Sequence, residues 1–180
     1  MPIQATQFRH PLGNGNLSED NDGDGYYVAQ DFGENNHLGE DWNGEGGGNS
    51  DSGDPVYATA NGTVVYVNSD GSYNSGWGNG IILRHDLPDG STVYSQYAHL
   101  LTGSINLTVG DDVDIGVEIA QLGNTGNSTY AHLHFEIKDH DSLGVAYSSN
   151  QSGFYDPTDF IQKFNSNNPS VGSTKDLTTS

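Results

Sequence analysis

The stretch HLHFEI at residues 132–137 predicts a β-strand whose two faces differ in chemistry. Because side chains alternate between faces along a strand, Leu133, Phe135 and Ile137 share an apolar face, which indicates a core strand. The two histidines share the opposite face with Glu136. Alternate residues of a strand lie about 6–7 Å apart, so both imidazoles can reach one centre, or one can bind a metal while the other faces a substrate. Taken alone, the pattern also fits two exposed surface histidines.

The composition excludes several classes of partner. A net charge of −19, from 24 acidic and 5 basic residues, leaves too few cations to neutralise the phosphates of nucleic acid or to bind an anionic membrane surface. The chain has no cysteine, which excludes disulfides and cysteine-based zinc sites. No apolar run reaches the length of about 18 residues that a membrane-spanning helix needs, so we expect no such helix.

The length of 180 residues predicts one domain with short tails. We expect the domain to occupy residues 6–164, preceded by a tail at residues 1–5 and followed by a polar, disordered tail at residues 165–180. Residues 1–20 have neither the basic start nor the apolar stretch of a signal peptide. An exported protein with this start requires a leader already removed or another export route.

The turn residues predict an all-β fold. The 25 glycines, with many Asn, Asp and Ser, indicate short strands joined by turns. Residues 55–67 predict a hairpin around Asn61-Gly62, and residues 81–99 predict a second one around Pro88-Asp89-Gly90. One short helix is expected at residues 156–163. The fold class is therefore all-β, with antiparallel sheets and hairpins around an open groove and very little helix.

Other polar residues can join the two histidines. His37 and Asp41 are four apart, which places them on one side of an extended segment or a helical turn, and both are ordinary zinc ligands. The alternative is a turn histidine near an exposed carboxylate. His99 ends a predicted strand on the same face as Tyr97, where it can lean into a groove. Trp77, in the Gly/Asn/Ser loop at residues 68–80, either contacts a ligand or packs back on the sheet.

A second metal site is suggested by acidic residues near the start of the chain. Asp20, Asp22, Asp24 and Asp31 have the spacing of a calcium loop, and Gly25 follows the third of them. No amphipathic helix flanks the loop, and its last position holds Asp rather than the usual Glu. A solvated acidic turn is the alternative, and a calcium-dependent surface module is the function that this loop alone would imply.

Several motifs in order resemble one family. They are the HxxxD at residues 37–41, GDPVYA at 53–58 followed by NGTV at 61–64, YAHL at 97–100, VDIG at 113–116, LGNTGNS at 122–128, and HLHFEI at 132–137. This series resembles the M23 peptidases, the LytM and lysostaphin-like zinc endopeptidases of bacterial cell walls. The resemblance extends from Phe8 to Phe160. The chain departs from the family pattern at the N-terminus and in the acidic stretch at residues 43–54, which bears on substrate choice.

The resemblance implies a role for each residue of the motifs. His37, Asp41 and His134 match the ligands of one catalytic zinc ion, and His99 and His132 match two histidines that assist without binding it. Three protein ligands leave a coordination position open, as a catalytic zinc requires. The motifs do not indicate which catalytic role belongs to His99 and which to His132. Glu136 either holds a ring N–H of a ligand or is an unrelated exposed residue.

The activity that this resemblance implies is zinc-dependent hydrolysis of the peptide cross-links in bacterial peptidoglycan, with a zinc-bound water attacking the scissile carbonyl and two histidines assisting. The bond cut is either in a glycyl bridge or in a D-alanyl cross-link. We expect a monomer that is secreted, periplasmic or on the bacterial cell surface. The alternative is a non-catalytic module of the same fold that binds the wall or activates another hydrolase.

Overall fold

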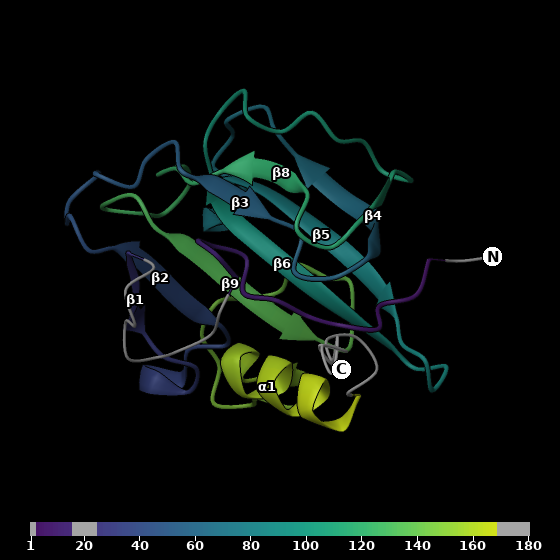
Figure 1. Ribbon diagram of the computed structural model, residues 1–180. Coiled ribbons are helices and arrows are strands. Elements are labelled where there is room, and N and C mark those ends of the chain that lie inside the picture. The colour runs from purple at the N-terminus through teal and green to yellow at the C-terminus, as the bar shows by residue number, and fades with distance from the viewer. Residues whose placement is uncertain (1–2, 16–24, 169–180) are drawn as a thin grey trace, which may run out of the picture.

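The computed structural model describes residues 3–15 and 25–168. The main sheet has eight antiparallel strands in the order β1-β2-β9-β6-β5-β4-β7, with β10 also pairing with β9, and β3 pairs with β8 in a separate sheet (Figure 1). The strands are β1 (Tyr26–Gln30), β2 (Glu40–Gly44), β3 (Pro55–Tyr57), β4 (Gly62–Asn68), β5 (Asn79–Asp86), β6 (Thr92–Leu100), β7 (Asp112–Val113), β8 (Glu118–Gln121), β9 (Leu133–Lys138) and β10 (Phe154–Tyr155). The helices are the short 3₁₀ turns η1 (Glu34–Asn36) and η2 (Asn74–Gly76) and the helix α1 (Pro157–Asn167). The predicted all-β class with little helix is confirmed.

Strand β9 lies inside the main sheet, between β2 and β6 (Figure 1). Leu133, Phe135 and Ile137 are completely buried, which confirms the apolar face expected from alternation. That face packs against the N-terminal segment, β3, β8 and α1, whose apolar residues belong to the same core. The opposite face of β9 therefore carries His134 toward the functional site, and His132 lies one residue before the strand begins.

The hairpin predicted at residues 55–67 is wrong. β3 pairs with β8, whereas β4 pairs with β5 and β7, so the two segments belong to different sheets. Between them the backbone N–H of Thr59 donates to the Tyr97 hydroxyl at 2.9 Å. The Asn61 side chain accepts from the backbone of Ile115 at 2.8 Å. The Asn-Gly pair thus holds a crossing between two sheets instead of closing a hairpin.

The second hairpin is confirmed, with β5 and β6 paired around residues 87–91. The predicted helix is also confirmed as α1: the Asp156 carboxylate accepts from the backbone N–H of Asp159 at 2.9 Å, which caps its first turn. No helix within the described ranges is both long and apolar enough to cross a membrane.

The packed part of the chain passes the predicted domain limits at both ends. Ala5 is completely buried, and α1 continues to Asn167. The Asn165 side chain accepts from the backbone N–H of Phe8 at 3.0 Å and donates to its carbonyl at 2.8 Å, which ties the helix to the N-terminal segment. The remaining division into domain and tails stays a prediction. The predicted calcium ligands Asp20, Asp22 and Asp24 lie outside the described residues.

Candidate metal centre

The pairing of β2 with β9 brings distant residues together. Asp41 lies directly opposite His134 in this antiparallel ladder, although the two are 93 residues apart in the sequence. His37 follows the turn η1 in an extended conformation, three residues before β2 begins. The segment can approach β9 because residue 39 is glycine: a Cβ there would lie 2.5 Å from the carbonyl oxygen of Phe135. The sequence reading missed Gly39, and a glycine inside the HxxxD motif was its only local signal.

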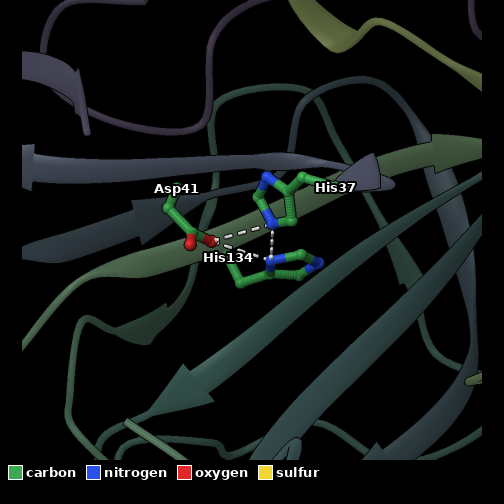
Figure 2. A group of neighbouring side chains, drawn as sticks. All are labelled: His37, Asp41 and His134. Atoms are coloured by element: carbon green, nitrogen blue, oxygen red, sulfur yellow. Dashed lines mark hydrogen bonds and ion pairs between the residues drawn. The ribbon is translucent and has the colours of Figure 1, made fainter. Parts of the chain in front are cut away.

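Three side-chain atoms converge between these segments (Figure 2). His37 Nε2 lies 3.1 Å from His134 Nδ1 and 3.4 Å from Asp41 Oδ1, and the latter two atoms are 2.8 Å apart. A tetrahedral zinc ion bound at 2.0–2.1 Å requires ligand atoms about 3.3 Å from one another. Two imidazoles and a carboxylate are also an ordinary zinc donor set. The three predicted ligands therefore fit such an ion in both chemistry and spacing.

In His37 and His134, the outer ring nitrogen, which faces away from the triad, also has a hydrogen-bond partner. His37 Nδ1 lies 3.3 Å from the carbonyl oxygen of Asp31, and His134 Nε2 lies 2.9 Å from Glu136 Oε1. Because these oxygens only accept, each ring donates outward, so the nitrogen that faces the triad is the one through which each ring can bind a metal. Glu136 is completely buried, so its reading as an unrelated exposed residue is wrong.

His99 reaches the site through a break in its strand. The face predicted from alternation, shared with Tyr97, is wrong, because Tyr97 packs in the core against Phe135. His99 has φ of 61°, and the β5–β6 register shifts beside it, so a bulge turns its side chain to the other face. Its ring centroid lies 4.6 Å from that of His132 and 6.2 Å from that of His134.

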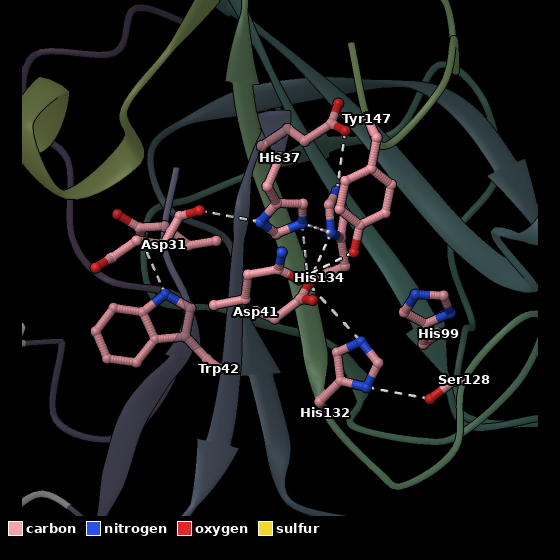
Figure 3. Close-up of polar contacts among 12 residues, drawn as sticks. Asp31, His37, Asp41, Trp42, His99, Ser128, His132, His134 and Tyr147 are labelled. Atoms are coloured by element: carbon pink, nitrogen blue, oxygen red, sulfur yellow. Dashed lines mark hydrogen bonds and ion pairs between the residues drawn. The ribbon is translucent and has the colours of Figure 1, made fainter. Parts of the chain in front are cut away.

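The two non-ligand histidines lie side by side next to the triad (Figure 3). His99 Nδ1 donates to the carbonyl of Thr125 at 2.8 Å, and His132 Nδ1 donates to the carbonyl of Tyr130 at 3.0 Å. Because carbonyls only accept, Nε2 is the free nitrogen on each neutral ring. His132 Nε2 lies 3.7 Å from Asp41 Oδ1. The structure thus brings together all five residues predicted from the sequence.

Burial and charge shift the protonation of this cluster. Burial, with the nearby His132 and His134, lowers the pKa of His99 to about 3, so His99 is neutral at pH 7. Burial alone would raise the pKa of Asp41, but hydrogen bonds from His134 and His37 hold it well below its usual range. Burial alone would lower the pKa of His134, but hydrogen bonds to Asp41 and Glu136 raise it to about 9. A metal ion entering the triad must therefore displace a proton from His134.

Asp41, His99, His132 and His134 line a cleft of about 690 Å³, and the fully buried His37 contacts it through Tyr147, which also lines the cleft. Three loops form the rim, at residues 75–77, 127–130 and 144–147. Trp77 is buried there, with its ring centroid 5.0 Å from that of His134. Tyr147 stacks on the His37 ring at 5.1 Å, and its hydroxyl donates to Gln30 at 2.9 Å (Figure 3). Asp41 is the one charged carboxylate among the described lining residues, so the walls are otherwise uncharged apart from histidines.

A family model described as peptidase family M23 matches residues 36–146, which include all five of these residues. This chain belongs to peptidase family M23. The M23 chain is 38% identical over 86 residues to the lipoprotein NlpD of Yersinia enterocolitica, a match that covers 48% of this chain and 78% of that relative. It is 34% identical over 85 residues to the peptidoglycan DD-endopeptidase ShyA of Vibrio cholerae, covering 47% of this chain and 17% of ShyA.

Solved structures of two peptidases share the architecture. The catalytic domain of lysostaphin from Staphylococcus simulans, an antimicrobial peptidase, is 27% identical, with a TM-score of 0.50 over 86% of this chain and 89% of that one. A zinc-containing peptidase from Vibrio cholerae is 25% identical, with a TM-score of 0.53 over 74% of this chain and 37% of that one. The M23 chain thus spans most of NlpD and of the lysostaphin domain but a minor part of ShyA and of the larger peptidase.

Proposed function

We propose that this M23 chain is a zinc-dependent endopeptidase that hydrolyses peptide cross-links in bacterial peptidoglycan. The observation that carries the proposal is the convergence of His37, Asp41 and His134, with donor atoms 2.8–3.4 Å apart, at the floor of a cleft that also contains His99 and His132. Relatives named as a peptidoglycan DD-endopeptidase and an antimicrobial peptidase support the class of reaction. The same relatives support a location in the bacterial envelope, outside the cytoplasm.

His37, Asp41 and His134 would hold the zinc ion, with Nε2, Oδ1 and Nδ1 as the respective donors. Bound zinc lowers the pKa of a water toward ~7 and polarises a carbonyl group. His99 and His132 each direct Nδ1 at a backbone carbonyl, so Nε2 is the nitrogen through which either ring can accept a proton from an attacking water. Once protonated, either ring can return the proton to the leaving amine or donate a hydrogen bond to the developing oxyanion.

The cleft walls favour an uncharged stretch of substrate. Tyr147 and the loop at residues 127–130, which includes the exposed Tyr130, offer aromatic surface and neutral polar groups, and no lysine or arginine of the described chain lines the cleft. An extended peptide with small, neutral residues suits such walls. Glycyl bridges and D-alanyl cross-links both have this character, and a cleavage assay on defined fragments distinguishes them.

The proposal is tested with zinc-loaded protein and purified sacculi or defined cross-linked muropeptides. We expect one zinc per chain by elemental analysis and new amino termini at one type of bond. Asp41→Ala should lose zinc and cleavage, whereas His99→Ala should keep zinc and lose cleavage. A wild-type protein that binds sacculi but releases no amino termini would contradict the proposal and identify the non-catalytic module instead.

A further inference from the structure

Behind His134, a charged pair is sealed inside the protein. Glu136 and Lys138 follow His134 on the same face of β9, and neither side chain is accessible to solvent. Lys138 Nζ lies 2.8 Å from Glu136 Oε2, while the other oxygen of the carboxylate, Oε1, lies 2.9 Å from His134 Nε2. The three side chains therefore form one continuous chain of contacts that begins at a predicted metal ligand and ends in the interior.

Neighbouring elements complete the enclosure of this pair. Gln96 lies directly opposite Glu136 on β6, and its side-chain oxygen accepts a hydrogen bond from Lys138. The Lys138 ammonium also lies 5.8 Å from the centre of the Phe154 ring, at the start of β10. On the other side, a Cβ on Gly39 would lie 2.9 Å from Glu136 Cγ. The carboxylate is thus held between β6, β10 and the segment that carries His37 and Asp41.

A buried ion pair is poor evidence of stabilisation on its own. Removing two charges from water costs about as much as their attraction returns, so an apolar pair of the same size is often as stable. Among the three predicted ligands, His134 is the one whose outer nitrogen contacts a charged partner; His37 contacts the neutral carbonyl of Asp31 at a longer 3.3 Å. This difference between the partners of His134 and His37 points to a role of the buried pair in metal binding rather than in stability.

We propose that Glu136 and Lys138 are positioning residues that fix His134 with Nδ1 facing the metal, an inference that rests on the zinc site of the proposed function. A carboxylate accepts but does not donate, so its contact keeps a proton on Nε2, and once a metal has displaced the proton that Nδ1 shares with Asp41, the Nδ1 lone pair is the one that faces the metal. The negative charge also makes the ring a stronger donor to a cation. Lys138 supplies the counter-charge that lets the carboxylate stay in a dry interior.

The test measures zinc affinity by competition with a chromophoric chelator on four forms of the full chain. They are the wild type, Lys138→Met, the double variant Glu136→Gln/Lys138→Met, and Lys163→Met as the matched control. Lys163 pairs with Asp159 on the surface of α1, away from the triad, so its loss should leave zinc affinity unchanged. We expect the single and the double variant to bind zinc about 10–100-fold more weakly than the wild type.

The double variant keeps the test decisive if Lys138→Met fails to fold, because it buries no unpaired charge. A second measurement needs no variant: nitrogen-15 spectra of zinc-loaded wild-type protein should show the His134 proton on Nε2. A folded double variant that binds zinc within twofold of the wild type, or a His134 proton on Nδ1, would overturn the inference alone. A wild type that binds no zinc would remove the proposed function and this inference with it.

Discussion

Replacing Gly39 by alanine should weaken metal binding although no predicted ligand is substituted. A Cβ at this position would lie 2.5 Å from the backbone oxygen of Phe135, 2.9 Å from Glu136 Cγ and 3.1 Å from His134 Cε1. An ordinary contact begins at 3.4 Å, so the segment at residue 39, just before β2, must move away from β9 by about 0.9 Å, the difference between 3.4 and 2.5 Å. The nearest atom belongs to backbone inside a sheet, which cannot rotate away as a flexible side chain can.

That displacement is large on the scale of metal coordination. Ligand distances in real sites stay within roughly 0.2 Å of ideal values, and Asp41 and His37 would both move away from His134. We expect zinc affinity to fall about 10–100-fold, which corresponds to about 1.4–2.7 kcal/mol of binding free energy. Overpacking should also lower the free energy of unfolding by about 1–3 kcal/mol.

The matched control is Gly62→Ala on β4. A Cβ there would lie 2.7 Å from the carbonyl oxygen of Arg84, a comparable clash between paired strands, but none of the three predicted ligands is involved. Both variants should melt at lower temperature than the wild type, and only Gly39→Ala should lose zinc affinity in a chelator competition. Equal zinc affinity in Gly39→Ala and wild type would refute the reasoning that this glycine sets the spacing of the site.

Two further predictions concern pH. The pKa of His134 in the metal-free protein is about 9, and a bound zinc ion displaces a proton from this ring. Zinc affinity, measured by calorimetric titration, should therefore rise about tenfold per pH unit from pH 7 toward pH 9 and then level off. An affinity that does not change with pH would contradict this protonation of His134. Burial raises the pKa of Glu40 to about 7 in the folded protein, whereas in the unfolded chain the pKa has its ordinary value of 4.5. Between pH 4.5 and 7, Glu40 therefore lowers the free energy of unfolding progressively, by up to about 3 kcal/mol. Over this range, the free energy of unfolding of Glu40→Gln, measured with denaturant, should rise relative to that of the wild type. If the two free energies change in parallel with pH, the raised pKa is excluded.

The position of Glu40 shows how the fold connects the site to α1. Its carboxylate accepts from the Trp42 indole at 2.8 Å and from the backbone N–H of Thr158, in the first turn of α1, at 3.1 Å. Glu40 and Asp41 are neighbours on β2 and point to opposite faces, one toward the helix and the other toward His134. One short strand thus anchors the C-terminal helix and carries a predicted ligand.

Features with a local cause were readable from the sequence. The period of two in residues 132–137 predicted which side chains of β9 are buried, because alternation depends only on the strand itself. The Pro88-Asp89-Gly90 turn predicts the β5–β6 hairpin, and the pattern at residues 156–163 predicts α1, since a turn and a short helix each depend on a few consecutive residues. The set of five site residues came from the order of motifs and their resemblance to a family.

Features that depend on pairing between distant segments were not readable. The hairpin that Asn61-Gly62 predicts does not form, because β3 pairs with β8 and β4 pairs with β5, both distant from the turn in the sequence. His99 was placed on the wrong face, because the bulge that turns it arises from its register with β5. The role of Gly39 depends on the atoms of β9 that lie close to it, and the role of Lys138 depends on its buried contact with Glu136; both require the tertiary structure.

The sequence by itself therefore determined the chemistry of this protein: which side chains are available to bind a cation, which strand carries them, and which family the chain resembles. The tertiary structure alone decided the geometry, namely that Asp41 lies opposite His134, that His99 turns toward His132, and that a buried carboxylate contacts the outer nitrogen of a predicted ligand. The reason is that alternation and caps act over a few residues, whereas distances between ligands depend on the register of strands that are about a hundred residues apart.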